Sequence, residues 1–276
     1  MDVASHAEGM HTIATGYGSH AEGIYTKTSQ AASHAEGYGE KDKEIIANGK
    51  GAHAEGYFTE ANGNGSHAEG AYTKTLHYKD NNGQNVSSDG VHAEGYYTIA
   101  QQKAAHAEGY ITEAIGVGTH TEGSHTKTIS YKGGSGEDVS SDGAHAEGHY
   151  TTAQYKGAHA EGYGKEGKEI TAIGFGAHAE GVYTNATGSG AHAEGYNTKT
   201  MYYKGGSGED ISSDGAHAEG HHTVAQRKGA HAEGYGIEGK EVTANGYGAH
   251  AEGTYTKALN DGAHAEGRET VATETN

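Results

Sequence analysis

Small and large polar residues alternate with a period of two in short stretches throughout the chain, and glycines separate these stretches. Near the start, Ser5 and Ala7 are small. The residues that follow them, His6 and Glu8, are large and polar. The same alternation returns over residues 11–14. Because side chains of a β-strand point to opposite faces in turn, the pattern predicts pairs of short strands. We expect the glycine after Glu8 to turn the chain between them.

The first stretch is one copy of a motif, His-Ala-Glu-Gly (once His-Thr-Glu-Gly), that occurs sixteen times. Successive copies are separated by 14 residues, or by 14 residues plus an insertion of 5 or 11. Insertions of constant size at a constant phase are typical of loops on a regular solenoid. The copies begin at His6, His20, His34, His53, His67, His92, His106, His120, His145, His159, His178, His192, His217, His231, His250 and His264.

The residues that point into such a coil are identified by substitutions at a fixed phase. Small residues hold these phases in most copies, and larger apolar residues replace them in the copies with insertions. In the 19-residue copies the replacements are Ile45, Ile170 and Val242. In the 25-residue copies we assign Val86, Val139 and Ile211 to the position of Ala14. The small residues therefore fill the interior, and the His and Glu side chains point outward.

The composition limits how stable one such coil can be. Only 33% of the residues are hydrophobic, Gly accounts for 48 residues, and Pro, Trp and Cys are absent. A coil filled with Ala, Ser and Thr buries little apolar area. At about 25 cal/mol per Å², this burial offsets little of the conformational entropy that is lost when each residue is ordered. A partner surface is therefore needed, and a homo-oligomer supplies one economically.

Charge and targeting signals exclude some classes of function. The net charge of −18 argues against binding to nucleic acid or to anionic membranes. No apolar run reaches the length of a membrane span, so no membrane insertion is expected, and no signal peptide opens the chain. The absence of cysteine excludes a disulfide framework. We expect one repetitive domain over residues 1–276, cut from a longer fibre.

The period and the frame of the motif resemble a known family. A 14-residue period with Ser-x-Ala-x-Gly, as in Ser5 to Gly9, resembles the YadA-like heads of trimeric autotransporter adhesins. It also resembles His-Ala-Glu-Gly arrays in tail fibre proteins of phages and prophages. The resemblance covers nearly all of residues 5–267 and implies a left-handed parallel β-roll of about sixteen coils, assembled as a homotrimer. Where the family carries aliphatic residues on the strand that faces the trimer axis, this chain carries His and Glu.

The His and Glu side chains of the motif have three interpretations, a metal site, a structural ladder and catalysis, and we set catalysis aside because catalytic sites are not built as uniform ladders. A metal site is the first, because imidazole and carboxylate bind zinc and similar ions; His6, Glu8, His20 and Glu22 would be its ligands. The one we favour is a structural ladder in which each imidazole donates to a carboxylate, and we expect no cofactor. Acid would break the ladder and loosen the trimer. Its members are His6, Glu8, His20, Glu22, His34, Glu36, His53, Glu55, His67, Glu69, His92, Glu94, His106 and Glu108.

Aromatic residues and insertions provide a candidate ligand surface. One aromatic row falls at the phase of His11 and is interrupted by Ile111 and Asn197. We place this row on the outer side of the second strand, where it covers the roll or seals a subunit contact, or else binds carbohydrate. The 11-residue insertions read as hairpins with Gly-rich tips. The short, charged 5-residue insertions either bind a partner or support neighbouring coils. The candidate ligand residues are Tyr78, Tyr131, Tyr203, Tyr97, Tyr150 and Tyr183.

These observations predict a structural or receptor-binding fibre segment that presents a cell-surface-binding face. Its partners would be two identical chains and a cell-surface glycan or protein receptor, and its location extracellular or on a virion. The alternatives are a passive filament without ligand, an ice-binding fibre and a polysaccharide-degrading fibre. The Thr-x-Thr segments suggest ice binding, but their threonines share the inward phase. No nucleophile elbow, phosphate loop or unique pair of acids suggests an enzyme.

Overall fold

The chain is built from strands alone over the part that the structure describes. Within those residues there is no helix. They form two parallel sheets of sixteen strands each and, apart from these, three two-stranded antiparallel hairpins. The chain divides into two compact units, Met1–Gly143 and Ala144–Asn276, and each contributes eight strands to either sheet. The repetitive parallel β-solenoid predicted from the spacing is thereby confirmed. The computed structural model describes residues 4–79, 85–86, 88–132, 138–201, 203–204 and 210–273.

In the N-terminal unit, each coil places its motif in the first sheet and its following strand in the second. The first-sheet strands are β1 (His6–Met10), β3 (His20–Ile24), β5 (His34–Tyr38), β7 (His53–Tyr57), β9 (His67–Ala71), β13 (His92–Tyr96), β15 (His106–Tyr110) and β17 (His120–Ser124). The second-sheet strands are β2 (Ile13–Ala14), β4 (Thr26–Thr28), β6 (Ile45–Ala47), β8 (Glu60–Ala61), β10 (Lys74–Leu76), β14 (Ile99–Gln101), β16 (Glu113–Ile115) and β18 (Lys127–Ile129).

The C-terminal unit repeats this arrangement. Its first-sheet strands are β21 (His145–His149), β23 (His159–Tyr163), β25 (His178–Val182), β27 (His192–Tyr196), β31 (His217–His221), β33 (His231–Tyr235), β35 (His250–Thr254) and β37 (His264–Arg268). Its second-sheet strands are β22 (Thr151–Gln154), β24 (Ile170–Ile173), β26 (Asn185–Thr187), β28 (Lys199–Thr200), β32 (Thr223–Ala225), β34 (Val242–Ala244), β36 (Lys257–Ala258) and β38 (Val271–Ala272).

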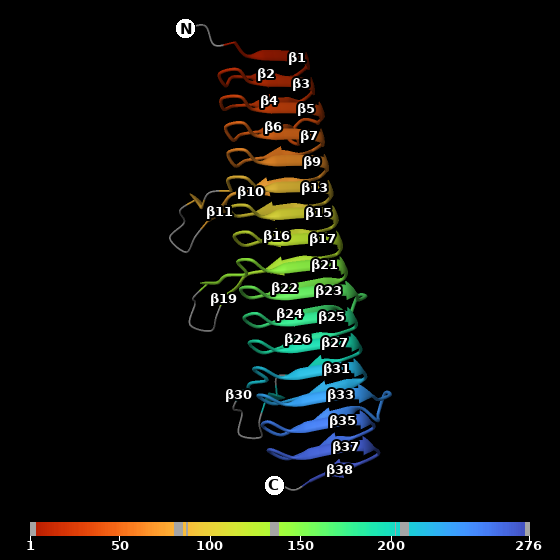
Figure 1. Cartoon of the computed structure of the whole chain (residues 1–276). Coiled ribbons are helices and arrows are strands. Elements are labelled where there is room, and N and C mark those ends of the chain that lie inside the picture. The colour runs from red at the N-terminus through yellow and green to blue at the C-terminus, as the bar shows by residue number, and fades with distance from the viewer. Residues whose placement is uncertain are drawn as a thin grey trace. The chain divides into compact units, whose positions relative to one another are not determined.

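Strand pairing follows the repeat residue by residue. In the first sheet, His6 lies opposite His20, and the glycines of the two motifs also lie opposite each other. In the second sheet, Thr26 lies opposite Ile45, which confirms that the isoleucine occupies the threonine position. Each motif therefore begins a new coil, and within each unit the coils stack one on the next (Figure 1).

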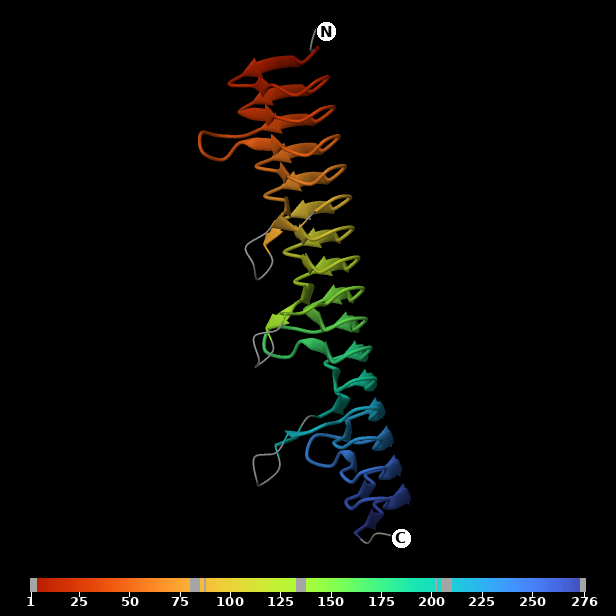
Figure 2. The same cartoon turned by 90° about the vertical axis from the view of Figure 1, so that its left-hand side faces the viewer.

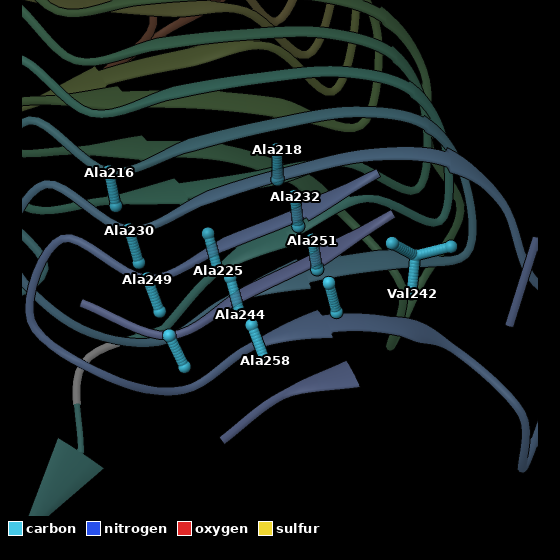
Figure 3. Packing of buried hydrophobic residues seen from close by; sticks show 12 residues of the cluster. Ala216, Ala218, Ala225, Ala230, Ala232, Val242, Ala244, Ala249, Ala251 and Ala258 are labelled. Carbon is cyan, nitrogen blue, oxygen red and sulfur yellow. The ribbon is translucent and has the colours of Figure 1, made fainter. Parts of the chain in front are cut away.

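The interior of each unit is filled by small side chains in columns. Figure 3 shows three alanine columns of the C-terminal unit, Ala216–Ala230–Ala249, Ala218–Ala232–Ala251 and Ala225–Ala244–Ala258. All of these residues are at most 1% exposed. The largest fully buried side chains include Ile45, Ile170 and Val242, at the predicted inward phase. The predicted division into an interior of small residues and an outer face of His and Glu is confirmed.

The motif glycine lies within a strand rather than at a turn, which corrects the prediction. Gly95 belongs to β13 and has a φ of +120°. A Cβ on Gly95 would lie 2.1 Å from the carbonyl oxygen of Gly109, its equivalent in the next coil. The glycine is required because it takes a left-handed backbone conformation and because successive coils approach there too closely for a side chain.

The 11-residue insertions form the predicted hairpins, β11 (Tyr78–Lys79) with β12 (Asn85–Val86), β19 (Tyr131–Lys132) with β20 (Asp138–Val139), and β29 (Tyr203–Lys204) with β30 (Asp210–Ile211). The assignment of Val86, Val139 and Ile211 to the position of Ala14 is wrong, because these residues pair within the hairpins. Thr75, Thr128 and Thr200 occupy that position instead. The second strand is complete before the hairpin begins, so the insertion follows the strand.

The 5-residue insertions enter the coil at the other end of the second strand. They form three tight loops, each closed by an antiparallel bridge: Glu40 with Lys43, Lys165 with Lys168, and Ile237 with Lys240. Within each unit, Figure 2 shows the hairpin strands and the short loop or loops leaving the coils toward the same side. The outer face of the second sheet therefore has hairpins at one end of its strands and short loops at the other.

Candidate functional site

The predicted ladder lies on the outer face of the first sheet in both units. Each imidazole Nε2 faces the Glu Oε2 of its own motif, from 3.2 Å at His67 and Glu69 to 3.8 Å at His264 and Glu266. Rings of successive coils lie 4.6 to 5.0 Å apart between centroids within each unit. The side chain of His67 is 32% exposed and that of Glu69 is 46% exposed. All fourteen predicted ladder residues occupy this face.

Stacking affects the protonation of the imidazoles. Partial burial lowers the pKa of His53, His106 and His231 below the usual value, because desolvation disfavours the charged ring. The imidazoles of the coils on either side lower the pKa further by charge repulsion. The Glu of the same motif opposes this effect but does not reverse it. Protonation of these three rings is therefore disfavoured. Their Nε2 atoms are buried without a hydrogen-bond partner in the described part of the chain and lie 3.4 to 3.7 Å from the Glu Oε2 of the same motif.

The ladder brings its His and Glu side chains together in pairs, which concerns the interpretation as a metal site. Within the described ranges, no group of three or more His, Asp or Glu side chains is arranged to hold a metal ion. Each Glu approaches the imidazole of its own motif, so the ladder is a row of pairs at His6 and Glu8, at His20 and Glu22, and onward.

The aromatic row lies at the corner between the two strands of a coil, and not on the second strand as predicted. We call the fifth residue after each motif His the corner residue. Tyr97, Tyr150 and Tyr183 are corner residues with φ of 54°, 51° and 57°. The N–H of Tyr97 donates to the carbonyl of Ala71 in the preceding coil at 2.9 Å. This hydrogen bond joins the coils and holds a side chain in a left-handed conformation that non-glycine residues seldom adopt.

A second aromatic row, which the sequence analysis missed, ends the first-sheet strands next to the corner. Tyr96 is 41% exposed, and its ring stacks on that of Tyr110 with 5.5 Å between centroids. Tyr96 also meets the corner ring of Tyr97 edge-on at 4.6 Å. The phase of these tyrosines, four residues after the motif His, was visible in the repeat. Together the two rows form an aromatic edge along each unit.

Each unit has a recess where a 5-residue loop overhangs the outer face of the second sheet. In the N-terminal unit the recess measures about 370 Å³ and is walled by the corner rings of Phe58, Tyr72 and Tyr97. In the C-terminal unit it measures about 420 Å³ and is lined by two loops, by Tyr183 and by several polar side chains. Two of the predicted ligand residues, Tyr97 and Tyr183, thus line recesses, whereas Tyr150 lines neither.

The remaining candidate ligand residues are Tyr78, Tyr131 and Tyr203. Their backbone begins the three hairpins, and their side chains lie outside the described part of the structure. The Thr-x-Thr segments are also placed: Thr26, Thr73 and Thr126 are buried, so these threonines present no exposed array to ice.

Comparison with known proteins adds no family assignment. No protein-family model matches the chain, and no curated protein matches its sequence. Among the described residues there is no helix long and apolar enough to cross a membrane.

Proposed function

We propose that this chain is a structural and receptor-binding fibre segment, assembled as a homotrimer of left-handed β-rolls like a YadA-like head or a phage or prophage tail fibre. The observation that carries the proposal is the His–Glu ladder on the outer face of a coil whose interior is almost entirely Ala, Ser and Thr. Such an interior buries little apolar surface, whereas the ladder offers a long, regular polar face that an identical chain can match.

The fibre presents a binding face toward a cell surface and works outside the cell or on a virion. Its second sheet supports this role, because hairpins and short loops recur there on a regular scaffold. Recurrent decorations on one side of a solenoid commonly form its binding face. Its ligand is a cell-surface glycan or protein receptor, and it is not an enzyme.

Binding of the fluorescently labelled protein to a panel of bacterial cells tests the binding role. We expect saturable binding to at least one cell type, with competition by unlabelled protein. A passive filament would show no saturable binding to any cell of the panel, and that result would contradict the proposal. A variant with all three hairpins shortened to two-residue turns separates binding by the hairpins from binding by the rest of the surface.

A further inference from the structure

The recess of the C-terminal unit is bounded by two 5-residue loops on coils that are four coil steps apart. Residues 165–168 close one end and residues 237–240 close the other. Three coils lie between them and supply the corner residues Tyr183, Asn197 and His222. With about 4.8 Å between parallel strands, the loops are separated by roughly 19 Å along the coil stack. The recess is therefore an elongated site rather than a small pit.

Both loops are held in place by their own side chains. The N–H of Gly167 donates to Glu169 Oε1 at 2.9 Å, and the N–H of Gly239 donates to Glu241 Oε1 at 3.0 Å. The ammonium group of Lys168 lies 5.7 Å from the ring centroid of Tyr183, a cation–π contact that ties the first loop to the next coil. The walls of the recess are therefore formed before any ligand arrives.

The floor carries hydrogen-bonding groups that are uncharged. The amide Nδ2 of Asn197 lies 2.9 Å from Nδ1 of His222. An amide nitrogen only donates, so Nδ1 accepts and the neutral ring carries its proton on Nε2. Desolvation lowers the pKa of His222; His221 and Lys199 lower it further, whereas Glu241 and Glu238 oppose the shift. Beside this pair, Oδ1 of Asn185 accepts from the Thr171 hydroxyl at 2.5 Å, which leaves the amide Nδ2 of Asn185 to donate.

The N-terminal unit provides an internal comparison at equivalent positions. There the corner residues after the loop are Phe58, Tyr72 and Tyr97, and the rings of Tyr72 and Tyr97 stack at 4.5 Å with only 2° between planes. The C-terminal unit has Asn197 and His222 in place of those two tyrosines. Amide and imidazole groups thus replace an aromatic wall at the same place in the fold.

The same comparison applies on the second sheet. In the N-terminal unit, Glu60 pairs with Lys74 at 3.6 Å. In the C-terminal unit the equivalent residues are Asn185 and Lys199, so an uncharged amide stands in place of the carboxylate. The recess still carries both signs of charge, from Lys168 and Lys199 and from Glu169, Glu238 and Glu241, which favours neither an anion nor a cation.

We propose that the C-terminal recess binds a short neutral oligosaccharide, whose hydroxyl groups hydrogen-bond with Asn185, Asn197 and His222. The rings of Tyr183 and Tyr196 form the apolar part of the wall, where the C–H groups of a sugar pack. Planar amide and imidazole groups suit hydroxyl groups because both donate and accept. The inference rests on the proposed function, since it names the ligand class and the place of the cell-surface contact.

A glycan array followed by titration of the best soluble neutral oligosaccharide tests the proposal. The informative variant is N197Y combined with H222Y, which rebuilds the aromatic wall of the N-terminal unit. Because Tyr72 and Tyr97 hold the same left-handed corners there, the variant is compatible with the fold. The matched control is Y72F combined with Y97F, which changes the same corner positions of the other recess and introduces no amide or imidazole there.

We expect the natural chain to bind at least one neutral glycan, and N197Y with H222Y to raise the Kd at least about tenfold. The control should keep the natural Kd. An array without neutral ligands, or a Kd that N197Y with H222Y leaves unchanged, would overturn the inference. So would a change in the mass of the assembly with N197Y and H222Y, because the recess would then be covered by a neighbouring copy. Cell binding that persists in this variant leaves the proposed function standing without this site.

Discussion

At the scale of single residues, the buried threonines of the interior differ in how their hydroxyl groups are used. Thr98 is fully buried, and its Oγ1 has no hydrogen-bond partner within the described part of the chain. Thr128 is also buried, but its Oγ1 accepts from the N–H of Ile115 at 2.9 Å and donates to the carbonyl of the same residue at 3.3 Å. At the position of Thr98 in other coils the chain carries Ile45 and Val242. The hydroxyl of Thr98 therefore lowers the stability of the fold, and the hydroxyl of Thr128 raises it.

Replacing Thr98 with valine tests this difference. Valine has the same shape, so T98V removes an unpaired buried hydroxyl without leaving a cavity. We expect the free energy of unfolding to rise by about 1 kcal/mol, measured by chemical denaturation followed by circular dichroism. The matched variant T128V should lower it by about 1 kcal/mol, because the N–H of Ile115 loses its partner, whereas the carbonyl of Ile115 keeps the Ser141 hydroxyl. Equal effects in the two variants would contradict the assignment.

The close approach of motif glycines makes a second residue-scale prediction. G95A should lower the free energy of unfolding by about 3 kcal/mol, because the new Cβ meets the carbonyl of Gly109 and the left-handed φ is strained. In G267A the φ is similar, at +110°, but the nearest atom to a Cβ is Thr270 Cγ2 at 3.9 Å. The free energy of unfolding of that variant should fall by only about 1 kcal/mol, which is the part caused by the strained φ. Thermal or chemical melts that show similar losses for both would contradict a steric role for the coil contact.

At the scale of elements, the motif strands of the first sheet stack imidazoles at regular spacing, and this makes stability depend on pH. The folded-state pKa of His53, His106 and His231 lies below the unfolded value of about 6.5. The unfolded chain therefore binds more protons below that pH. The contribution of these three neutral rings to stability is fully present above pH 6.5 and is lost as the pH falls toward their folded-state pKa.

Thermal unfolding between pH 8 and pH 5, at constant 0.15 M salt, measures this dependence. We expect a flat Tm above pH 7 and a fall below pH 6.5. The variant H106Q removes one titrating ring from the stack and should reduce the slope of the fall without moving its start. A Tm that stays constant or rises through pH 6 would contradict the lowered pKa of these three partly buried histidines. The salt keeps the reduction in net negative charge from masking the effect.

The sequence predicted the elements better than the connections between them. Spacing alone identified the coils, the inward alanines and the outward His and Glu, because one substitution pattern is repeated sixteen times. It did not show that the motif glycine sits within a strand, since a glycine marks a close backbone approach and a turn in the same way. It misplaced Val86 because the phase of a residue inside an insertion is undefined until the strand before it is known to be complete.

The sequence also predicted only part of the candidate site. Tyr97 and Tyr183 were found by their aromatic character, but the polar set around His222 was not, because its members belong to three different coils. A signal was present in the interruption of the aromatic row at Asn197. Only the structure shows that the corner residues of successive coils line one recess, so that the interruption changes the chemistry of that recess.

At the scale of the whole molecule, the proposed trimer forms by association of identical chains through the ladder face. Motif strands of both units present half-exposed imidazoles and carboxylates in the same register. An identical chain can satisfy this face along its full repeat, and burial between chains would further disfavour charged imidazoles. Acid that protonates the ladder should therefore separate the chains as well as destabilise each one.

The mass of the assembly in neutral solution, measured by analytical ultracentrifugation over a range of protein concentrations, tests this claim most directly. We expect three times the mass of the chain at pH 7.5, with a shift toward the single-chain mass as the pH falls below 6. A particle with the mass of one chain at every concentration at pH 7.5 would contradict it.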